Sequence, residues 1–179
     1  MPSAELIETA RVRLCPFQAV HLNDIYVSWL NDPDVVRYSE QRHRRHDLSA
    51  CRHWVETMRA GGHLLWAIEV KQPSLGHVGN IVGYVDLANK VADVSIMIGE
   101  RAARGQGLGV EAWRGACDWL LAQSYIRKVT GGTMAANRAM VCTMERTGMR
   151  PDGVRLGQFL LDGQAVDLVH YARFASAAG

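Results

Sequence analysis

Three glycines at alternate positions, Gly105, Gly107 and Gly109, stand directly before an amphipathic segment that begins at Val110. An apolar run over residues 92–98 precedes them, so we expect a strand, a glycine-rich turn and then a helix. The first N–H groups of a helix have no intrahelical partner and carry partial positive charge, and glycines let such groups crowd around an anion. The pattern therefore predicts a phosphate-binding turn at the end of a strand.

Two common nucleotide motifs do not account for this turn. The dinucleotide fingerprint GxGxxG, begun at Gly105, requires glycine at the position where Val110 stands. A P-loop requires a Gly-Lys pair followed by Ser or Thr, and the sequence contains no Gly-Lys pair. The turn therefore belongs to neither of these nucleotide-binding classes.

A basic segment, VVRYSEQRHRRH over residues 35–46, is the second candidate for chemistry. It gathers four arginines and two histidines around Tyr38 and Glu40. One interpretation is a solvated loop, because charge runs usually mark exposed faces. The other is a substrate rim, in which the basic groups meet a phosphate or carboxylate and Glu40 meets a cation. On the second interpretation Tyr38, Glu40 and Arg42 are the substrate-binding residues.

The composition limits the class of protein. With 48% hydrophobic and 21% charged residues, the 179-residue chain is typical of a single globular domain over residues 1–179. A formal net charge of +2 does not favour nucleic-acid or membrane partners. The four cysteines lie far apart, which argues against a metal site or a disulfide framework. No stretch resembles a signal peptide or a membrane span, so we expect a cytoplasmic protein.

Hydrophobic periodicity and turn residues predict the elements that position the candidate residues. We expect helices over residues 18–30, 48–60, 110–124 and 137–147, and strands over residues 9–14, 63–70, 80–87, 91–98, 127–134, 154–161 and 165–174. The three consecutive strands between residues 63 and 98 form an antiparallel meander, and Asp162-Gly163 is the turn of a final hairpin. The resulting order is β-α-α-β-β-β-α-β-α-β-β.

The motif Arg104-Gly105-Gln106-Gly107-Leu108-Gly109 reads R-x-x-G-x-G at a strand-to-helix turn. It resembles the pyrophosphate loop of the GNAT superfamily of acetyl-CoA-dependent N-acetyltransferases, whose later helix begins at an asparagine, as in NRAMVCTMERTGM from Asn137 here. The segments WLNDPDVVRY and VDLVHYARF look like the branch that includes ribosomal-protein N-terminal acetyltransferases. The resemblance spans nearly the whole chain. It implies an α/β fold with a twisted, mainly antiparallel sheet of six to seven strands flanked by helices.

The resemblance also implies a cofactor site. Backbone amides across Arg104, Gly105, Gln106, Gly107, Leu108 and Gly109 would hold the pyrophosphate of acetyl-CoA. The strand end at residues 95–98 would splay from the next strand and leave room for the pantetheine arm. The amide of Met97 or Ile98 would then polarise the acetyl carbonyl. Asn137 would contact the arm, act as a helix N-cap, or do both.

Two positions depart from the family pattern, and they leave the general acid unassigned. Met144 stands where a tyrosine often follows the asparagine by seven residues, and Met140 where the ribosomal branch often has a serine. For the general base, Asp93 occupies the early strand position where some family members carry a glutamate, and Glu40 on the expected rim is its rival.

The sequence therefore predicts direct acetyl transfer to a primary amine, since no cysteine with a histidine partner lies in the motif segments. The acceptor that the basic rim favours is a small molecule, such as an amino sugar, a nucleotide-linked sugar or an aminoglycoside-like compound. The alternatives are the N-terminal amine of a ribosomal or other protein, and a catalytically silent acetyl-CoA-binding module. A homodimer is left open, and no metal is expected.

Overall fold

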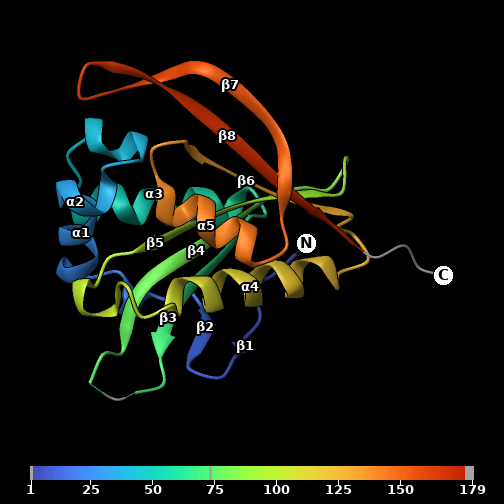
Figure 1. The fold of residues 1–179 in the computed structure, drawn as a ribbon. Coiled ribbons are helices and arrows are strands. Elements are labelled where there is room, and N and C mark those ends of the chain that lie inside the picture. The colour runs from blue at the N-terminus through green and yellow to red at the C-terminus, as the bar shows by residue number, and fades with distance from the viewer. Residues whose placement is uncertain (1, 73, 176–179) are drawn as a thin grey trace.

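The computed structural model describes residues 2–72 and 74–175. Within these residues, eight strands form one sheet in the order β1-β2-β3-β4-β5-β6-β8-β7 (Figure 1). The strands are β1 (Ile7–Glu8), β2 (Val12–Pro16), β3 (Leu64–Val70), β4 (His77–Asp86), β5 (Val91–Ile98), β6 (Lys128–Met134), β7 (Arg150–Leu161) and β8 (Gln164–Phe174). The expected mixed, mainly antiparallel fold is confirmed, with one strand more than the six to seven predicted.

The additional strand is the two-residue β1, which pairs antiparallel with β2. The sequence predicted one strand over residues 9–14, but the N–H of Thr9 donates to Val12 O and turns the chain there. The alternation of Thr9, Arg11 and Arg13 with apolar residues therefore spans a turn as well as a strand. A side-chain pattern of period two does not distinguish these cases over so few residues.

Helices cover both faces of the sheet. The α-helices are α1 (Asp24–Leu30), α2 (Pro33–Val36), α3 (Leu48–Ala60), α4 (Leu108–Leu121) and α5 (Arg138–Arg146), and the 3-10 turns are η1 (Ala19–His21), η2 (Glu40–His43) and η3 (Arg101–Ala103). The helix expected over residues 18–30 begins only at Asp24, because the Asn23 side chain accepts the N–H of Tyr26 and caps α1 there. Among the described helices, none is long and apolar enough to cross a membrane.

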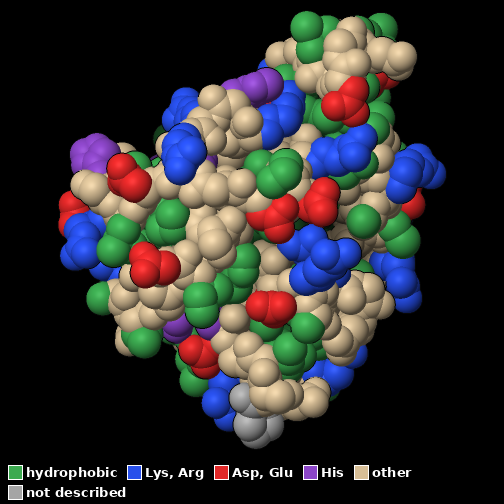
Figure 2. Space-filling model, turned by 90° about the vertical axis from the view of Figure 1, so that its left-hand side faces the viewer, with side chains coloured by type: hydrophobic (Ala, Val, Ile, Leu, Met, Phe, Trp, Pro, Cys, Tyr) green, Lys and Arg blue, Asp and Glu red, His purple; other side chains and the backbone are tan. Residues whose placement is uncertain are grey.

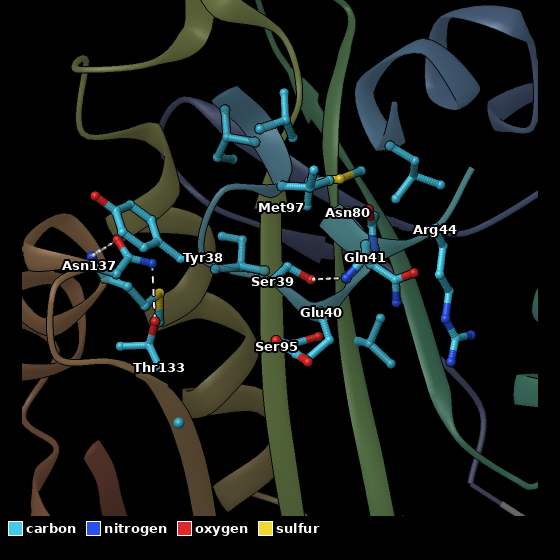
Figure 3. Close-up of a pocket in the computed structure, with 18 of the residues that line it drawn as sticks. Tyr38, Ser39, Glu40, Gln41, Arg44, Asn80, Ser95, Met97, Thr133 and Asn137 are labelled. Atoms are coloured by element: carbon cyan, nitrogen blue, oxygen red, sulfur yellow. Dashed lines mark hydrogen bonds between the residues drawn. The ribbon is translucent and has the colours of Figure 1, made fainter. Parts of the chain in front are cut away.

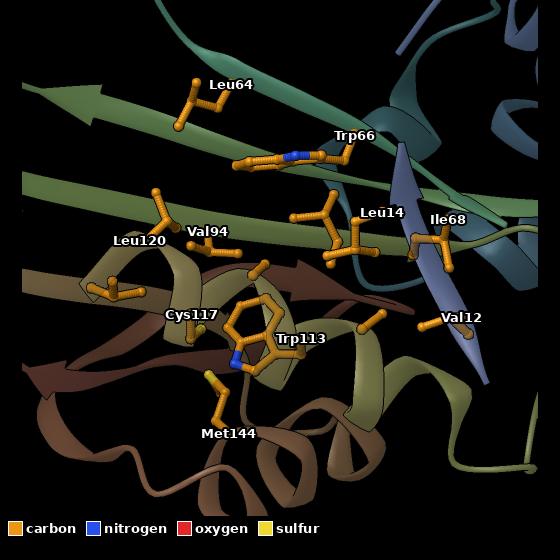
Figure 4. Close-up of a cluster of buried hydrophobic side chains, with 14 of the residues drawn as sticks. Val12, Leu14, Leu64, Trp66, Ile68, Val94, Trp113, Cys117, Leu120 and Met144 are labelled. Atoms are coloured by element: carbon orange, nitrogen blue, oxygen red, sulfur yellow. The ribbon is translucent and has the colours of Figure 1, made fainter. Parts of the chain in front are cut away.

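Side chains alternate across the sheet and supply two hydrophobic clusters. On one face, Trp113 of α4 packs with Leu120 and Met144 against apolar side chains of β2, β3 and β5 (Figure 4). On the other face, Tyr26 and Trp29 of α1 pack with residues of α3 against β3 and β4. The central strands β4 and β5 are therefore held between two packed layers.

Strands β5 and β6 form the one parallel pair among the described strands, and their pairing is short. It covers Val91 to Asp93 of β5 and ends where Asp93 lies opposite Thr130. From Gly131 to Met134, β6 pairs with β8 only. Gly131 also accommodates α4, since a Cβ there would lie 2.9 Å from the Trp113 ring. Because the pairing of β5 with β6 ends at Asp93, residues 94–98 of β5 lack a β6 partner, which confirms the expected splay.

The hairpin of β7 and β8 turns at Asp162-Gly163, as the sequence predicted. Figure 1 shows this hairpin arching away from the sheet toward α2 and η2. Its tip is tied there by two arginines. Arg37 Nη2 lies 3.0 Å from Asp162 Oδ2, and Arg42 Nη2 donates to Leu160 O at 3.1 Å. The hairpin and the α2–η2 segment therefore form a bridge, which we call the arginine bridge.

Candidate active site

A cavity of about 650 Å³ lies between the splayed end of β5 and the α2–η2 segment. Strands β4, β5 and β6, helices α3 and α5, and the β7–β8 hairpin complete its walls. Figure 3 shows lining side chains from the segment at η2, among them Ser39, Glu40 and Gln41, together with Ser95 and Met97 of β5. Of the residues predicted from sequence, the cavity brings together Tyr38, Glu40, Met97, Ile98 and Asn137.

The end of β5 presents a backbone donor to the splay. The N–H of Gly99 donates to Val78 O of β4 at 2.9 Å. Since successive N–H groups of an antiparallel strand point to opposite sides, the N–H of Ile98 points away from β4 and into the splay. A fixed N–H at this place suits the oxygen of a carbonyl group. Of the two predicted amides, the geometry favours Ile98 over Met97.

The glycine-rich turn has the geometry of an anion site. Gly105 and Gly107 take the left-handed conformation, with φ of 74° and 76°, and Gly107 is the N-cap of α4. Within the described residues, the N–H groups of Gly105, Gln106 and Gly107 have no hydrogen-bond partner. Together with the first N–H groups of the 14-residue helix α4, they form a group of neighbouring donors that suits an anion.

Arg104 holds this turn in place. Its N–H donates to Arg101 O at 3.1 Å, and its guanidinium donates to Ile98 O at 3.3 Å and Gly99 O at 2.7 Å. These bonds fix the turn against the end of β5. Next to it, Gly109 lies so close to β5 that a Cβ would be 3.4 Å from the Ile98 side chain, and Leu108 is buried in the core. Among the described residues of the turn, the backbone N–H groups without a hydrogen-bond partner therefore begin at Gly105.

Asn137 acts as the N-cap of α5. Its Oδ1 accepts the N–H of Met140 at 3.3 Å, and its Nδ2 donates to Thr133 Oγ1 at 3.1 Å. The residue also lines the cavity, where Figure 3 shows it beside Thr133. The predicted capping is present, and the side chain is positioned for contact with a ligand as well.

The structure separates the two carboxylates that were rivals for the general base. Glu40 lines the cavity, with Oε1 2.9 Å from Arg42 Nη2. Asp93 lies instead at the closed end of the splay and is not among the described residues that line the cavity. Burial raises the pKa of the Asp93 carboxyl, and the hydrogen bond from Thr130 lowers it in part.

Arg42, predicted to bind substrate, is committed to the protein itself. Besides Glu40 and Leu160 O, its guanidinium contacts Ser39 O at 3.0 Å. It does not appear among the described residues that line the cavity. We therefore assign Arg42 to positioning Glu40 and the hairpin.

Asn80 of β4 is the site residue that sequence reasoning missed. It lines the cavity opposite Met97 in the β4–β5 ladder and is only 6% exposed. Its Oδ1 has no hydrogen-bond partner among the described residues. An unpaired buried amide oxygen costs roughly 1–3 kcal/mol. One feature of the sequence indicates it, because Asn80 is the single polar residue within the apolar run from Val78 to Val82.

The outer part of the cavity carries further basic groups that sequence analysis had placed on the rim. Arg44 and Arg45 line it and form no ion pair within the described residues. His46 also lines it, and its buried Nε2 has no partner in the described part of the chain. On the face seen in Figure 2, basic, acidic and histidine side chains are interspersed. Nowhere in the described residues do three or more His, Cys, Asp or Glu form a group that could hold a metal ion.

The sequence profile described as "Acetyltransferase (GNAT) domain" matches residues 11–150. A comparison with curated protein sequences gave no match.

Several solved structures share the fold at low identity. The ribosomal α-N-protein acetyltransferase RimL in complex with coenzyme A superposes with a TM-score of 0.82 and 16% identity, over 97% of this chain and 99% of that chain. Spermidine N-acetyltransferase from Vibrio cholerae in complex with CoA and spermine gives 0.81 and 15%, over 93% and 97%. A GNAT acetyltransferase from Bacillus anthracis gives 0.79 and 16%, over 96% and 99%.

Proposed function

Because the chain belongs to the GNAT acetyltransferase family, we propose that it transfers the acetyl group of acetyl-CoA to the primary amine of a small molecule. One observation carries the acceptor class. The cavity that adjoins the splayed end of β5 is lined on its other side by residues of the α2–η2 segment and of the β7–β8 hairpin, the two segments that the arginine bridge joins. A cavity of about 650 Å³ is within the size range of small-molecule sites.

The turn and the splay fit the cofactor. The unpaired N–H groups of Gly105, Gln106 and Gly107 suit a pyrophosphate, and the splay leaves room for an extended arm beside β5. Asn137 lines the cavity next to the splay, so we assign it to contact that arm. When bound, acetyl-CoA supplies an acetyl group activated as a thioester. The N–H of Ile98 then donates to the acetyl oxygen and favours attack at the carbonyl carbon.

The acceptor nitrogen has to lose a proton, because an ammonium group has no free electron pair. Glu40 is the carboxylate of the cavity, so we assign it as the group that accepts this proton, directly or through one water. A thiol is a fairly strong acid, as the cysteine pKa near 8.5 illustrates, so the CoA thiolate leaves without a dedicated acid. It then takes up the second proton that the nitrogen loses as the amide forms, directly or through water, which fits the methionines at positions 140 and 144.

The experiment is a coupled measurement of CoA release and acetyl-CoA binding. Purified protein is assayed for free CoA thiol with amino sugars, aminoglycosides and short peptides that have a free N-terminus. Turnover with small amines and little with peptides is the expected result. Turnover with peptides alone would assign a protein N-terminus as acceptor. Tight acetyl-CoA binding by calorimetry without turnover would indicate a silent binding module.

A glycine pair tests the cofactor part of the proposal. Gly107→Ala strains a left-handed residue within the donor set, and we expect it to weaken acetyl-CoA binding at least tenfold. Gly76→Ala strains a left-handed glycine in the β3–β4 loop, where a Cβ has open space, and serves as the matched control. Equal affinities for both variants would contradict the assignment.

A further inference from the structure

We propose that the acceptor amine also carries an anionic group, a phosphate or a carboxylate. Its amine end contacts Asn80, and its anionic end contacts Arg44 and Arg45 at the outer part of the same cavity. This inference rests on the proposed function and specifies the class of acceptor.

The amine end is defined by Asn80. Its buried Oδ1 lacks a partner within the described residues, and the residue faces Met97 across the ladder, one position from the Ile98 donor. Figure 3 shows Asn80 next to Met97, with Gln41 close to it. An amine N–H that donates to Oδ1 pairs this oxygen and restores the hydrogen bond lost on burial. The arrangement therefore favours an amine at Asn80.

A neutral amide oxygen suits the reacting form of the amine. It accepts an N–H without requiring a charge on the nitrogen, so it holds the amine after Glu40 has taken the proton. With one N–H bound to Asn80, the nitrogen electron pair is free to point toward the carbonyl that Ile98 binds. Asn80 would thus orient the acceptor, and Glu40 would deprotonate it.

The anionic end is defined by the two arginines of the basic segment that are not used in contacts within the protein. Arg37 and Arg42 are used in the arginine bridge. Arg44 and Arg45 line the cavity and have no carboxylate partner in the described part of the chain. Two unpaired guanidinium groups at one cavity suit phosphate or carboxylate, which they bind through paired N–H donors.

His46 completes this end and is fixed in position. Its N–H donates to Asn31 Oδ1 at 2.9 Å, and its carbonyl accepts from Asn31 Nδ2 at 2.8 Å. The residue lines the cavity, and its buried Nε2 has no partner among the described residues. The backbone that follows the two arginines is therefore held by a reciprocal pair of hydrogen bonds. A positioned ring nitrogen beside them provides a third polar contact for an anion.

The test compares amines that differ only in their anionic group. Ethanolamine is compared with phosphoethanolamine, glucosamine with glucosamine 6-phosphate, and 3-aminopropanol with β-alanine. We expect kcat/KM to be at least about tenfold higher for the anionic member of a pair. The phosphate and carboxylate pairs show which anion is preferred. Equal or higher kcat/KM for the neutral members would overturn the proposal.

Substitutions test whether Arg44 and Arg45 cause the preference for anionic amines. The double variant Arg44→Gln/Arg45→Gln should reduce the anionic-to-neutral ratio of kcat/KM to near one. Arg52→Gln, which removes an exposed charge from α3 outside the cavity lining, is the control and should keep the ratio. Asn80→Ala should lower kcat for both members of a pair by a similar factor. A ratio that survives the double variant would contradict an anion site at Arg44 and Arg45.

A binding measurement separates this inference from the proposed function. Calorimetry of CoA-loaded protein with phosphoethanolamine and with glucosamine 6-phosphate reports the anion site even if no amine is acetylated. Binding that the double variant abolishes, without turnover, would support the anion site and contradict the proposed transfer. Turnover of neutral amines without preference for anionic ones would support the proposed transfer and contradict the anion site.

Discussion

The Thr130 hydroxyl donates a 2.6 Å hydrogen bond to Asp93 at the last paired position of β5 and β6. This contact marks the closed end of the splay. Ile98 lies five positions after Asp93 in the strand, which corresponds to roughly 16 Å along an extended strand. We therefore propose that Asp93 supports the closed end of the splay and that Glu40, which lines the cavity, is the general base.

Asp93→Asn tests this placement. The amide oxygen still accepts from Thr130, so we expect kcat to change by less than about threefold. Desolvation raises the pKa of Asp93, but its side chain is still partly exposed, so ionisation disfavours the folded state only slightly and the variant should be slightly more stable at neutral pH. This advantage should vanish as the pH falls toward the unfolded value near 4. A large loss of kcat with intact acetyl-CoA binding would return the base to Asp93.

Glu40→Gln removes the proposed proton acceptor. We expect kcat to fall about 100-fold with acetyl-CoA affinity unchanged, because general-base assistance contributes about 10²–10⁴. The loss should diminish at high pH, where more of the amine is already deprotonated. The pH profile of kcat measures this. Glu56→Gln, an exposed residue of α3, is the control, and wild-type rates for Glu40→Gln at every pH would refute the assignment.

Gly99→Ala tests the packing that positions the end of β5. A methyl group at Gly99 would overlap the ring of Trp29, which α1 places against this strand end. We expect a destabilisation of about 1–3 kcal/mol and weaker acetyl-CoA binding, because Ile98 and the turn shift together. Urea unfolding and calorimetry measure the two effects. Gly83→Ala, whose Cβ would lie 3.6 Å from Leu64, should be tolerated, and equal effects of the two would contradict this account.

We expect the stability of the protein to depend on pH through the lowered pKa of His77. Burial and the neighbouring His21 lower the pKa of His77 to about 4. As the pH falls below about 6.5, the unfolded chain takes up this proton first, so the free energy of unfolding decreases. The loss should end near pH 4, where folded His77 is also protonated.

Unfolding of wild type and His77→Gln between about pH 7 and pH 4 measures this loss. The variant should show a smaller decrease, by on the order of 1 kcal/mol after allowance for partial exposure. His53→Gln on the exposed side of α3 is the control. Parallel curves for wild type and His77→Gln would show that His77 does not titrate as described.

The local elements were predictable because local patterns define them. Strand β5 over residues 91–98 and helix α3 over residues 48–60 match the expected bounds, since each has clear periodicity between turn residues. The glycine turn was predictable from spacing, because left-handed positions require glycine. The late start of α1 was missed because a cap at Asn23 interrupts an otherwise helical apolar pattern.

The acceptor side depends on contacts that no local pattern encodes. Arg37 and Asp162 are 125 positions apart, and only the folded chain shows that they join. The same holds for Arg42 and Leu160, so an arginine that looked like a ligand for substrate is part of the bridge. Asn80 was missed for a related reason, since its unpaired state depends on how α1, α3 and η2 surround β4.

The most direct test of the account identifies the acetylated atom in a competition. Wild-type protein is incubated with isotopically labelled acetyl-CoA and a mixture of small primary amines and N-terminal peptides, and the products are analysed by tandem mass spectrometry. The account predicts label on the amine nitrogen of small molecules, most of all those with a phosphate or carboxylate. Label confined to peptide N-termini, or none despite acetyl-CoA binding, would contradict it.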